Sequence, residues 1–442
     1  MAVDQIRQEN DWPLIEPVTG AGKAFYITIA ALSVVVAAAI FAYVHQYRNG
    51  LAVTGLSRQI FWGVYITNFV FFIGISHAGA LIVAVLRLVR AEWRRPISRA
   101  AEVITVLALL MGVANILIDL GRPDRVLYML IHANFRSPLL WDVVAVTLYL
   151  TASAIYLFIA LIPDVALLRD RLGKRRWLYD SLSLGWKGTD RQQVQLEKGG
   201  SFMAVIIVLL AVSVHTVVSF VFIMTIQPMW HAAILAPYFV AGAIFSGIAT
   251  ITVMIAATRK AYHLEEYIKP VHFNNLGLFL LTMSLFWFYF TLAEFLTAFY
   301  GNEPQEMAVF WSKFTGAYAP YFWVMFLLCF IIPLPILAFK RTRTVTGTVI
   351  ASISVIIGMW LERYAIIIPT LNAQRLVMDP VSYRPTWVEW LILAGCVSFF
   401  VLMYMVFTKL FPIVSIWEVK EGKEKTAMPP TEPIRKEEAP LN

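Results

Sequence analysis

The chain has 442 residues, of which 59% are hydrophobic and 14% are charged, and its mean hydropathy is +0.70. This composition excludes a soluble globular domain and a disordered chain, because both carry far more polar residues. The net charge of +8 does not indicate nucleic-acid binding, since the basic residues are spread over connections between apolar stretches, where they meet the lipid surface.

Ten apolar stretches are long enough to cross a bilayer, which takes about 20 helical residues. Backbone groups in hydrocarbon must pair within their own segment, and the stretches lack the alternation of barrel strands, so we predict helices. In chain order they cover residues 22–46, 59–86, 99–120, 138–162, 201–226, 233–257, 273–299, 318–339, 344–368 and 386–411. The predicted fold is an all-α polytopic membrane protein with about ten transmembrane helices.

Lys and Arg are distributed unequally between the connections on the two sides of these spans. One set of connections, with the adjoining span ends, holds 27 of them, whereas the other set holds 8. This bias predicts that both termini lie in the cytoplasm. Residues 1–21 lack the apolar core of a signal peptide and are predicted to be a cytoplasmic tail. Residues 413–442, rich in Lys, Glu and Pro from about 418, are predicted to be a flexible cytoplasmic tail.

Ionisable residues within the spans are the candidates for function. A charged group at membrane depth costs about 2.5–3.5 kcal/mol, so it usually faces a bundle interior and has a role there. Two histidines, His77 and His215, fall near the middle of their spans. The other candidates fall nearer the ends of spans, with Glu102 toward the cytoplasm and the rest toward the opposite side: Asp119, Asp142, Glu294, Glu362, Arg363 and Glu389.

Each histidine allows two interpretations. An imidazole with a pKa near 6.5 can exchange a proton with a quinol hydroxyl. The alternative is a core histidine that is hydrogen-bonded to a hydroxyl group. Small residues around His77, in the run GISHAGA, favour a tight pocket there.

The acidic residues also have structural alternatives. Glu102, Asp142 and Glu389 lie near helix N-termini, where the helix dipole favours a carboxylate. Asp119 could cap its helix end through Arg122.

Glu362 and Arg363 are adjacent and should point in different directions on a helix. We therefore predict that they do not pair with each other and that Arg363 pairs elsewhere, for example with Glu294.

Several sequence runs resemble a known family. These are NILIDLGRPDRVLYML and NFRSPLLWDVVAVTLYL within 115–150, WGVYITNFVFFIGISHAGALI at 62–82, LIPDVALLRDR at 161–171, TLAEFLTAFYGN at 291–302 and MWLERYAIIIP at 359–369. They are similar to the NrfD/PsrC-type membrane subunits of bacterial quinone-linked redox complexes, and most similar to the quinol-interacting ActC-type subunit of alternative complex III.

The resemblance implies two four-helix bundles, at 58–226 (with a basic cytoplasmic loop, 163–200) and 227–370, flanked by single helices within 22–57 and 371–412. It implies a quinol site near the non-cytoplasmic face, in the first bundle, formed by His77, Asp119, Arg122 and Asp142. The implied proton path or bundle-stabilising residues are Glu102, His215, Glu294, Glu362 and Arg363.

The resemblance also concerns cofactors and partners. It implies a protein of the bacterial cytoplasmic membrane that uses quinol, with menaquinol as the expected form, and holds no metal, haem or iron–sulfur cluster. Cys329 and Cys396 are too few for a cluster, which needs about four ligands. The implied partners are c-type cytochrome subunits, an iron–sulfur protein subunit and a second NrfD-type subunit in the same membrane.

We therefore predict a subunit that oxidises menaquinol near the non-cytoplasmic face and passes electrons to partner subunits, with proton translocation as a linked hypothesis. One alternative is the membrane anchor of a molybdopterin-type sulfur or polysulfide reductase. A second is a secondary transporter, for which Pro333 and Pro335 could break a helix. A third is a cytochrome b, although two intramembrane histidines allow at most one haem.

Overall fold

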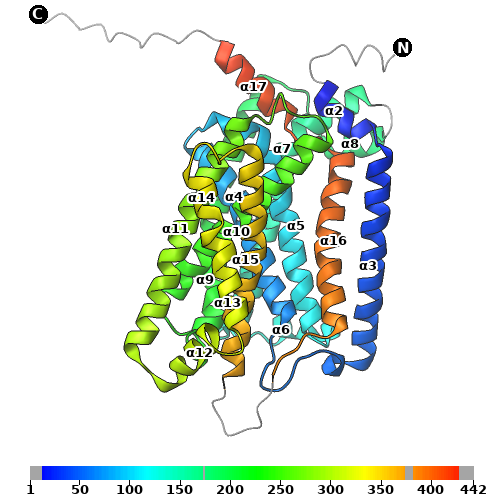
Figure 1. Ribbon diagram of the computed structural model, residues 1–442. Helices are drawn as coiled ribbons and strands as arrows, with labels where there is room; N and C mark the ends of the chain where they lie inside the picture. The colour runs from blue at the N-terminus through cyan, green and yellow to red at the C-terminus, as the bar shows by residue number, and fades with distance from the viewer. Residues whose placement is uncertain (1–11, 173–174, 374–381, 428–442) are drawn as a thin grey trace, which may run out of the picture.

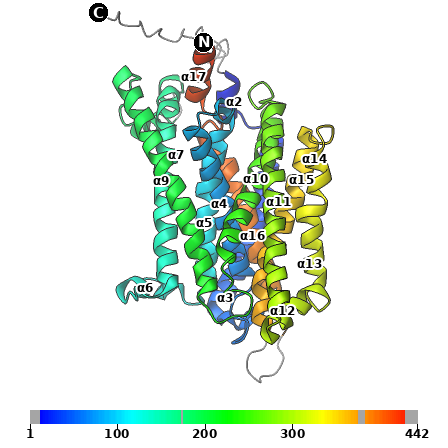
Figure 2. The same ribbon diagram turned by 90° about the vertical axis from the view of Figure 1, so that its left-hand side faces the viewer.

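The computed structural model describes residues 12–172, 175–373 and 382–427, and the regular structure within these ranges is helical (Figures 1 and 2). Ten helices in the described part of the chain are long and apolar enough to cross a membrane. The prediction of an all-α polytopic membrane protein is therefore confirmed. The outer parts of the two predicted tails, 1–11 and 428–442, lie outside the described residues.

The spans run side by side along one common direction (Figure 1). Their bounds are α3 (Lys23–Asn49), α4 (Val64–Leu88), α5 (Arg95–Asp119), α7 (Pro138–Arg171), α9 (Asp190–Ile223), α10 (Leu235–Ala261), α11 (Pro270–Gly301), α13 and α14 (Ala319–Phe326 and Pro333–Ala338, joined by a π-helical turn at Leu327–Ile331), α15 (Val345–Asn372) and α16 (Trp387–Leu410).

The spans form two packed groups. In the first group α4 packs on α5, α5 on α7, α7 on α9, and α9 returns to α4. The second group contains α10, α11, α13–α14 and α15, and it joins the first through contacts of α10 and α15 with α4. The remaining helices, α3 and α16, pack against each other at one edge, with α16 against α5 and α4 (Figure 1).

Short helices distinguish the two ends of the molecule. One end, here called the terminal face, carries α2 (Trp12–Thr19), α8 (Arg176–Leu182) and α17 (Ile416–Ala427). The other end, here called the opposite face, carries α6 (Tyr128–Ile131) and α12 (Pro304–Phe314) (Figures 1 and 2).

Helix α4 is the centre of the fold. In the most apolar stretch of α4, 93% of the residues are buried, whereas the corresponding value for α3 is 11%. Helix α4 is therefore enclosed by protein, and α3 faces lipid. Small residues let the neighbours of α4 approach closely, as is usual between helices in membranes. A Cβ atom at Gly79 would overlap Thr105 and the Ala101 carbonyl of α5, and one at Gly74 would crowd Ser246 of α10.

The span from α13 to α14 is interrupted by the π-helical turn at Leu327–Ile331, but its two halves continue as one packed segment. Pro333 has no N–H for the carbonyl four residues before it, that of Cys329. The hydroxyl of Ser284 donates to this Cys329 carbonyl at 2.9 Å, and Ser354 donates to the Leu328 carbonyl at 2.8 Å. Hydroxyls from α11 and α15 thus satisfy carbonyls at the π-helical turn, which is a structural solution to the proline break.

The structure shows helices in two segments of the terminal face that were predicted as a tail and a loop. The predicted flexible tail from 413 begins with an ordered segment, because Ile413, Val414 and Ile416 are buried and α17 packs on α5 and α7. The predicted loop 163–200 is mostly helical, because α7 continues to Arg171 and α9 begins at Asp190, beyond the apolar stretches.

Candidate functional site

The centre of the first bundle holds a pair of histidines. His77 of α4 and His215 of α9 have ring centroids 4.0 Å apart, with an angle of 55° between the ring planes. The Tyr149 ring of α7 lies 5.6 Å from that of His77. Both histidines are fully buried, so three helices of the bundle close around one small polar group.

The interpretation of these histidines as core residues bonded to a hydroxyl is not supported. All four ring nitrogens are buried without a hydrogen bond of ordinary geometry to a described residue, although the Ala211 backbone lies near His77. The nearby hydroxyls are used elsewhere, since Tyr149 and Thr105 both donate to the backbone carbonyl of Ser76, at 3.2 and 3.1 Å. Buried polar atoms without partners are rare and costly, so this pair is a candidate for contact with a ligand or with water.

The pair does not fit an iron held between two imidazoles. Metal–nitrogen bonds of about 2 Å on opposite sides of a metal place ring centroids about 6 Å apart. The centroids of His77 and His215 are 4.0 Å apart and their planes are tilted. The geometry of the two rings therefore argues against the cytochrome b alternative.

A buried stripe of polar residues runs along the inner face of α7. Asp142 lies seven residues before Tyr149, and Tyr156 lies seven residues after it, so all three share one helix face at intervals of about 10 Å. Asp142 is 5% exposed, and its Oδ1 atom has no partner among the described residues. The stripe includes Ser153, whose hydroxyl is likewise buried and unpaired in the described structure. It extends from Asp142, near the opposite face, past the level of the histidines toward the terminal face.

Asp119 and Glu389 belong to a separate network near the opposite face. Glu389 is fully buried and accepts hydrogen bonds from the Gly55 N–H at 2.7 Å and the Tyr383 hydroxyl at 2.5 Å. Asp119 lies close enough to interact with the Glu389 charge, and its Oδ1 atom is buried without a described partner. Burial, together with Glu389, raises the pKa of Tyr383 far above its usual value.

This network also involves Tyr65, which lies near Asp119 and donates to Gln46 of α3 at 2.5 Å. Tyr65 precedes His77 by twelve residues on α4, which is about 18 Å along the helix axis. The structure therefore places Asp119 in a different group from the histidine pair, and the four predicted quinol-site residues do not form one contact cluster.

Arg122 lies outside both groups. Its guanidinium is 64% exposed and bonds Asp124, with Nε–Oδ1 at 3.3 Å, rather than capping Asp119 as considered from the sequence. This hydrogen bond holds the pKa of Asp124 below its usual value. An exposed pair of this kind contributes little to stability.

Glu362 and Arg363 of α15 pair with each other, so the prediction that they pair elsewhere is wrong. Arg363 Nη1 lies 3.2 Å from Glu362 Oε2, and both side chains are 1% exposed. Adjacent residues can meet in this way because both side chains are long and neither is in contact with water, which leaves the ion pair as the nearest compensation for each charge. The guanidinium stacks over Phe239 at 4.8 Å, in space left by Gly242, which has no Cβ.

This ion pair extends the polar interior into the second bundle. Arg363 lies close enough to His215 for their charges to interact. On the other side, Glu362 interacts with Glu294 of α11. Glu294 also interacts with Lys313 of α12. Burial lowers the pKa of Lys313, and the nearby Glu294 carboxylate partly offsets this lowering. The chain of groups therefore runs from the histidine pair to the opposite face.

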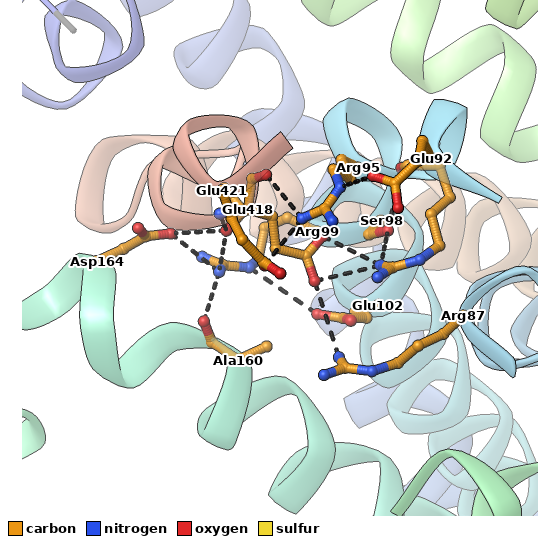
Figure 3. Close-up of polar contacts among 12 residues, drawn as sticks. Arg87, Glu92, Arg95, Ser98, Arg99, Glu102, Ala160, Asp164, Glu418 and Glu421 are labelled. Atoms are coloured by element: carbon orange, nitrogen blue, oxygen red, sulfur yellow. Dashed lines mark hydrogen bonds and ion pairs between the residues drawn. The ribbon is translucent and has the colours of Figure 1, made fainter. Parts of the chain in front are cut away.

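The terminal face holds the densest cluster of charges, in which α17 meets α5 and α7 (Figure 3). Arg99 Nη2 lies 3.0 Å from Asp164 Oδ2, with both side chains 1% exposed, and also donates to the Ala160 carbonyl at 2.7 Å. Glu418 of α17 accepts from Arg94 at 3.1 Å and lies 3.8 Å from Arg87.

Glu102 is at the inner edge of this cluster. Its Oε2 atom is 3.9 Å from Arg99 Nε, yet forms no hydrogen bond with a described residue. It lies near Tyr156, the last member of the α7 stripe. Of the predicted proton-path residues, the structure thus groups His215, Arg363, Glu362 and Glu294, and places Glu102 apart from them.

Sequence reasoning missed several members of these groups. Tyr149 and Tyr156 were not singled out, although they follow Asp142 at seven and fourteen residues, a spacing that marks one helix face. Two further members, Asp164 and Glu418, fall within segments predicted to be a basic loop and a flexible tail. Asp164 lies in the run LIPDVALLRDR, and a carboxylate beside so apolar a stretch could have marked it as a buried charge.

One group of potential metal ligands lies on the opposite face. Ligand atoms of His231, Glu303 and Glu306 are all within 4.8 Å of one another. His231 Nε2 is 3.4 Å from Glu306 Oε1, and the His231 side chain is 48% exposed. An exposed ion pair accounts for this arrangement, and we assign no metal to it.

The chain is similar in sequence to named subunits of oxidoreductases. The chain is 25% identical over 424 residues to a putative dimethyl sulfoxide reductase membrane subunit of Halobacterium salinarum, covering 91% of this chain and 94% of that protein. It is 23% identical over 418 residues to a selenate reductase subunit of Mesobacillus selenatarsenatis, with coverage of 88% and 94%.

A third relative is the Hdr-like menaquinol oxidoreductase integral membrane subunit of Archaeoglobus fulgidus, which is 24% identical over 432 residues, with coverage of 92% and 98%. The sequence pattern of the family described as polysulphide reductase, NrfD, matches residues 52–374. This match spans both four-helix groups and all the buried polar groups of the first bundle. The chain belongs to the NrfD family of membrane proteins.

Proposed function

We propose that this chain is the quinol-binding membrane subunit of an oxidoreductase complex, and that the substrate is menaquinol. Membership of the NrfD family supports the membrane-subunit role. The names of the relatives, two of them reductase subunits and one a menaquinol oxidoreductase subunit, support a link to quinone-coupled electron transfer.

The observation that carries the proposal is the set of buried, unpartnered proton acceptors in the first bundle. Oxidation of one quinol releases two electrons and two protons, so its site needs two acceptors for protons. His77, paired with His215, and Asp142 are such groups. The two hydroxyls lie at opposite ends of the quinol ring, so acceptors that each make a hydrogen bond of about 2.8 Å stand about 10 Å apart. The rise along α7 from Asp142 to Tyr149, whose ring lies against His77, is also about 10 Å, which supports this assignment.

Each residue then has a defined task. His77 accepts the proton of one hydroxyl through a ring nitrogen, while His215 stabilises the charge that results by sharing that proton. Asp142 accepts the proton of the other hydroxyl. Tyr149 holds the His77 ring in place from the third side. Asp119 is the second choice for the carboxylate, because its Oδ1 atom is also buried and unpaired in the described structure, but it lies farther from the histidines.

The electrons leave through partner subunits. This chain offers two cysteines, both buried and in different spans, so a cluster on the route belongs to a partner. We place an iron–sulfur protein, with a molybdenum-type enzyme or a c-type cytochrome beyond it, on the opposite face, close to Asp142. In this orientation the basic terminal face is cytoplasmic, as the Lys and Arg bias predicts.

Proton movement is a linked proposal. The groups from His215 through Arg363 and Glu362 to Glu294 form one route into the second bundle. The α7 stripe from Tyr149 to Tyr156, together with Glu102, forms a second route to the terminal face. Such chains of ionisable groups inside a membrane are typical of proton relays.

The test is quinol oxidation by membranes that carry the assembled complex. We expect His77→Ala and Asp142→Asn each to lower the rate by about a hundredfold, the usual contribution of a positioned proton acceptor. The matched controls are His263→Ala and Asp180→Asn, which remove the same groups from exposed positions on the terminal face and should leave the rate unchanged.

A soluble electron donor that reduces the partner subunits directly separates loss of the quinol site from loss of assembly. The rate of the complex with this soluble donor should be the same in all variants. Full quinol oxidation by His77→Ala and Asp142→Asn would refute the assignment of these residues.

A further inference from the structure

A cavity of about 580 Å³ lies at the terminal face, away from all the polar groups described above. It is bounded by the first turns of α3, by the last turns of α10 and α16, and by α2. Residues of α3 and of α10 line it from two sides, and both walls include small side chains. Ala24 on α3 and Ala257 on α10 are both exposed.

The cavity has a polar end and an apolar end. Lys409, Tyr262 and Glu16 lie at the level of the terminal face. Val401 and Met254 lie eight residues farther into α16 and α10, which is about 12 Å deeper along the helix axes. Its long direction is therefore that of the membrane normal, with the apolar end toward the middle of the bilayer.

Lys409 is fixed at the polar end. Its ammonium donates to the Pro17 carbonyl at 2.7 Å and to the Gly20 carbonyl at 2.5 Å, and it stands 4.6 Å above the Phe25 ring. An ammonium group has three N–H donors, so one remains for a ligand. Two hydroxyl pairs also line this end and the wall below it, Tyr262 with Thr408 at 2.7 Å and Thr258 with Tyr404 at 3.0 Å.

The charge around the polar end is mainly positive. Arg175 of the connection before α8 donates to the Lys409 carbonyl at 2.8 Å, and Lys23 and Lys260 lie at the adjoining ends of α3 and α10. Among the described residues that line the cavity, Glu16 is the one carboxylate, and its side chain is exposed to solvent. The mouth thus complements an anion better than a neutral or cationic group.

We propose that this cavity binds one acidic phospholipid of the leaflet at the terminal face, with its phosphate at Lys409 and an acyl chain between α3 and α10. The orientation of a phospholipid in that leaflet, with its headgroup at the surface and its chains toward the midplane, is the orientation of the cavity. Through contacts with α2, α3, α10 and α16, the lipid joins the outer helix pair to the second bundle.

The experiment is native mass spectrometry of the purified full chain titrated with dioleoyl phosphatidylglycerol, with dioleoyl phosphatidylcholine as the competing lipid. Wild type should retain one phosphatidylglycerol per chain in a saturable manner and in preference to phosphatidylcholine. Lys409→Gln should weaken this binding about fivefold, because one cation near the headgroup is lost. Lys340→Gln, which removes an exposed cation from the connection between α14 and α15, outside the cavity lining, should bind within twofold of wild type.

Two variants that fill the cavity, one from each wall, test whether it holds an acyl chain. Ala257→Phe and Ala24→Phe should each lose the tightly held lipid, and their thermal unfolding without added lipid should match that of wild type. Equal lipid retention by wild type and both filling variants would overturn the proposal. Displacement of phosphatidylglycerol by a soluble naphthoquinone, with Lys409→Gln unaffected, would also overturn it in favour of a quinone site.

Discussion

The ion pair between Arg99 and Asp164 allows a quantitative test of how the terminal face is held together. Asp164→Asn removes the carboxylate but leaves the guanidinium buried, since both side chains are 1% exposed. Breaking one partner of such a pair destabilises by about 3–5 kcal/mol. Glu102 lies 3.9 Å from Arg99 and compensates part of the charge, so we expect a value near the lower limit, about 3 kcal/mol.

The assay is a double-mutant cycle with Arg99→Met and Asp164→Asn, in which unfolding in detergent is followed by tryptophan fluorescence. Trp417 is a local reporter, because its backbone N–H donates to Asp164 at 2.9 Å. The double variant removes both charges of the pair, although Glu102 loses its Arg99 neighbour, so it should be destabilised by less than the sum of the two single variants, with a coupling energy of about 3 kcal/mol. A coupling below about 1 kcal/mol, typical of exposed pairs, would refute the reasoning that this cluster is buried and interdependent.

Three further changes follow from the packing and the polar networks. Gly79→Ala places a Cβ against Thr105 and should lower the free energy of unfolding by about 2 kcal/mol. An unchanged free energy of unfolding would show that α4 and α5 are not in close contact. Glu362→Gln should reduce the number of protons moved per electron while quinol oxidation continues, and an unchanged ratio in proteoliposomes would remove Glu362 from the route. Tyr383→Phe removes one hydrogen bond to the buried Glu389 and should destabilise by about 1–3 kcal/mol, which a shift in the thermal midpoint would confirm and an unaltered midpoint would contradict.

The spans could be predicted from the sequence because the bilayer sets their length and polarity. Their ends could not, because a helix does not stop where its apolar run stops. Arg169 and Asp170 still lie within α7, although they are too polar for the hydrocarbon. The order in α17 was also out of reach, because its composition is that of a solvated tail. Its position depends on contacts with distant parts of the chain, such as those of Glu418 with Arg87 and Arg94.

The individual site residues were easier to predict than their grouping. His77 and His215 stood out because imidazoles are rare at mid-span, but only the packing of α4 against α9 shows that their rings meet. Arg122 resembled a site residue through its motif, yet it lies in an exposed turn. The pairing of Glu362 with Arg363 depends on side-chain conformations that helix periodicity alone does not determine.

Photolabelling with an azido-quinone tests the central claim most directly. The purified chain is irradiated with the probe, with and without excess menaquinone, and the modified peptides are mapped by mass spectrometry. The quinol site proposed between His77 and Asp142 predicts labels on α4 near His77 and on the first turns of α7, suppressed by menaquinone and lost in His77→Ala. Competable labels confined to other regions, such as the terminal-face cavity or the Asp119–Glu389 network, would contradict it.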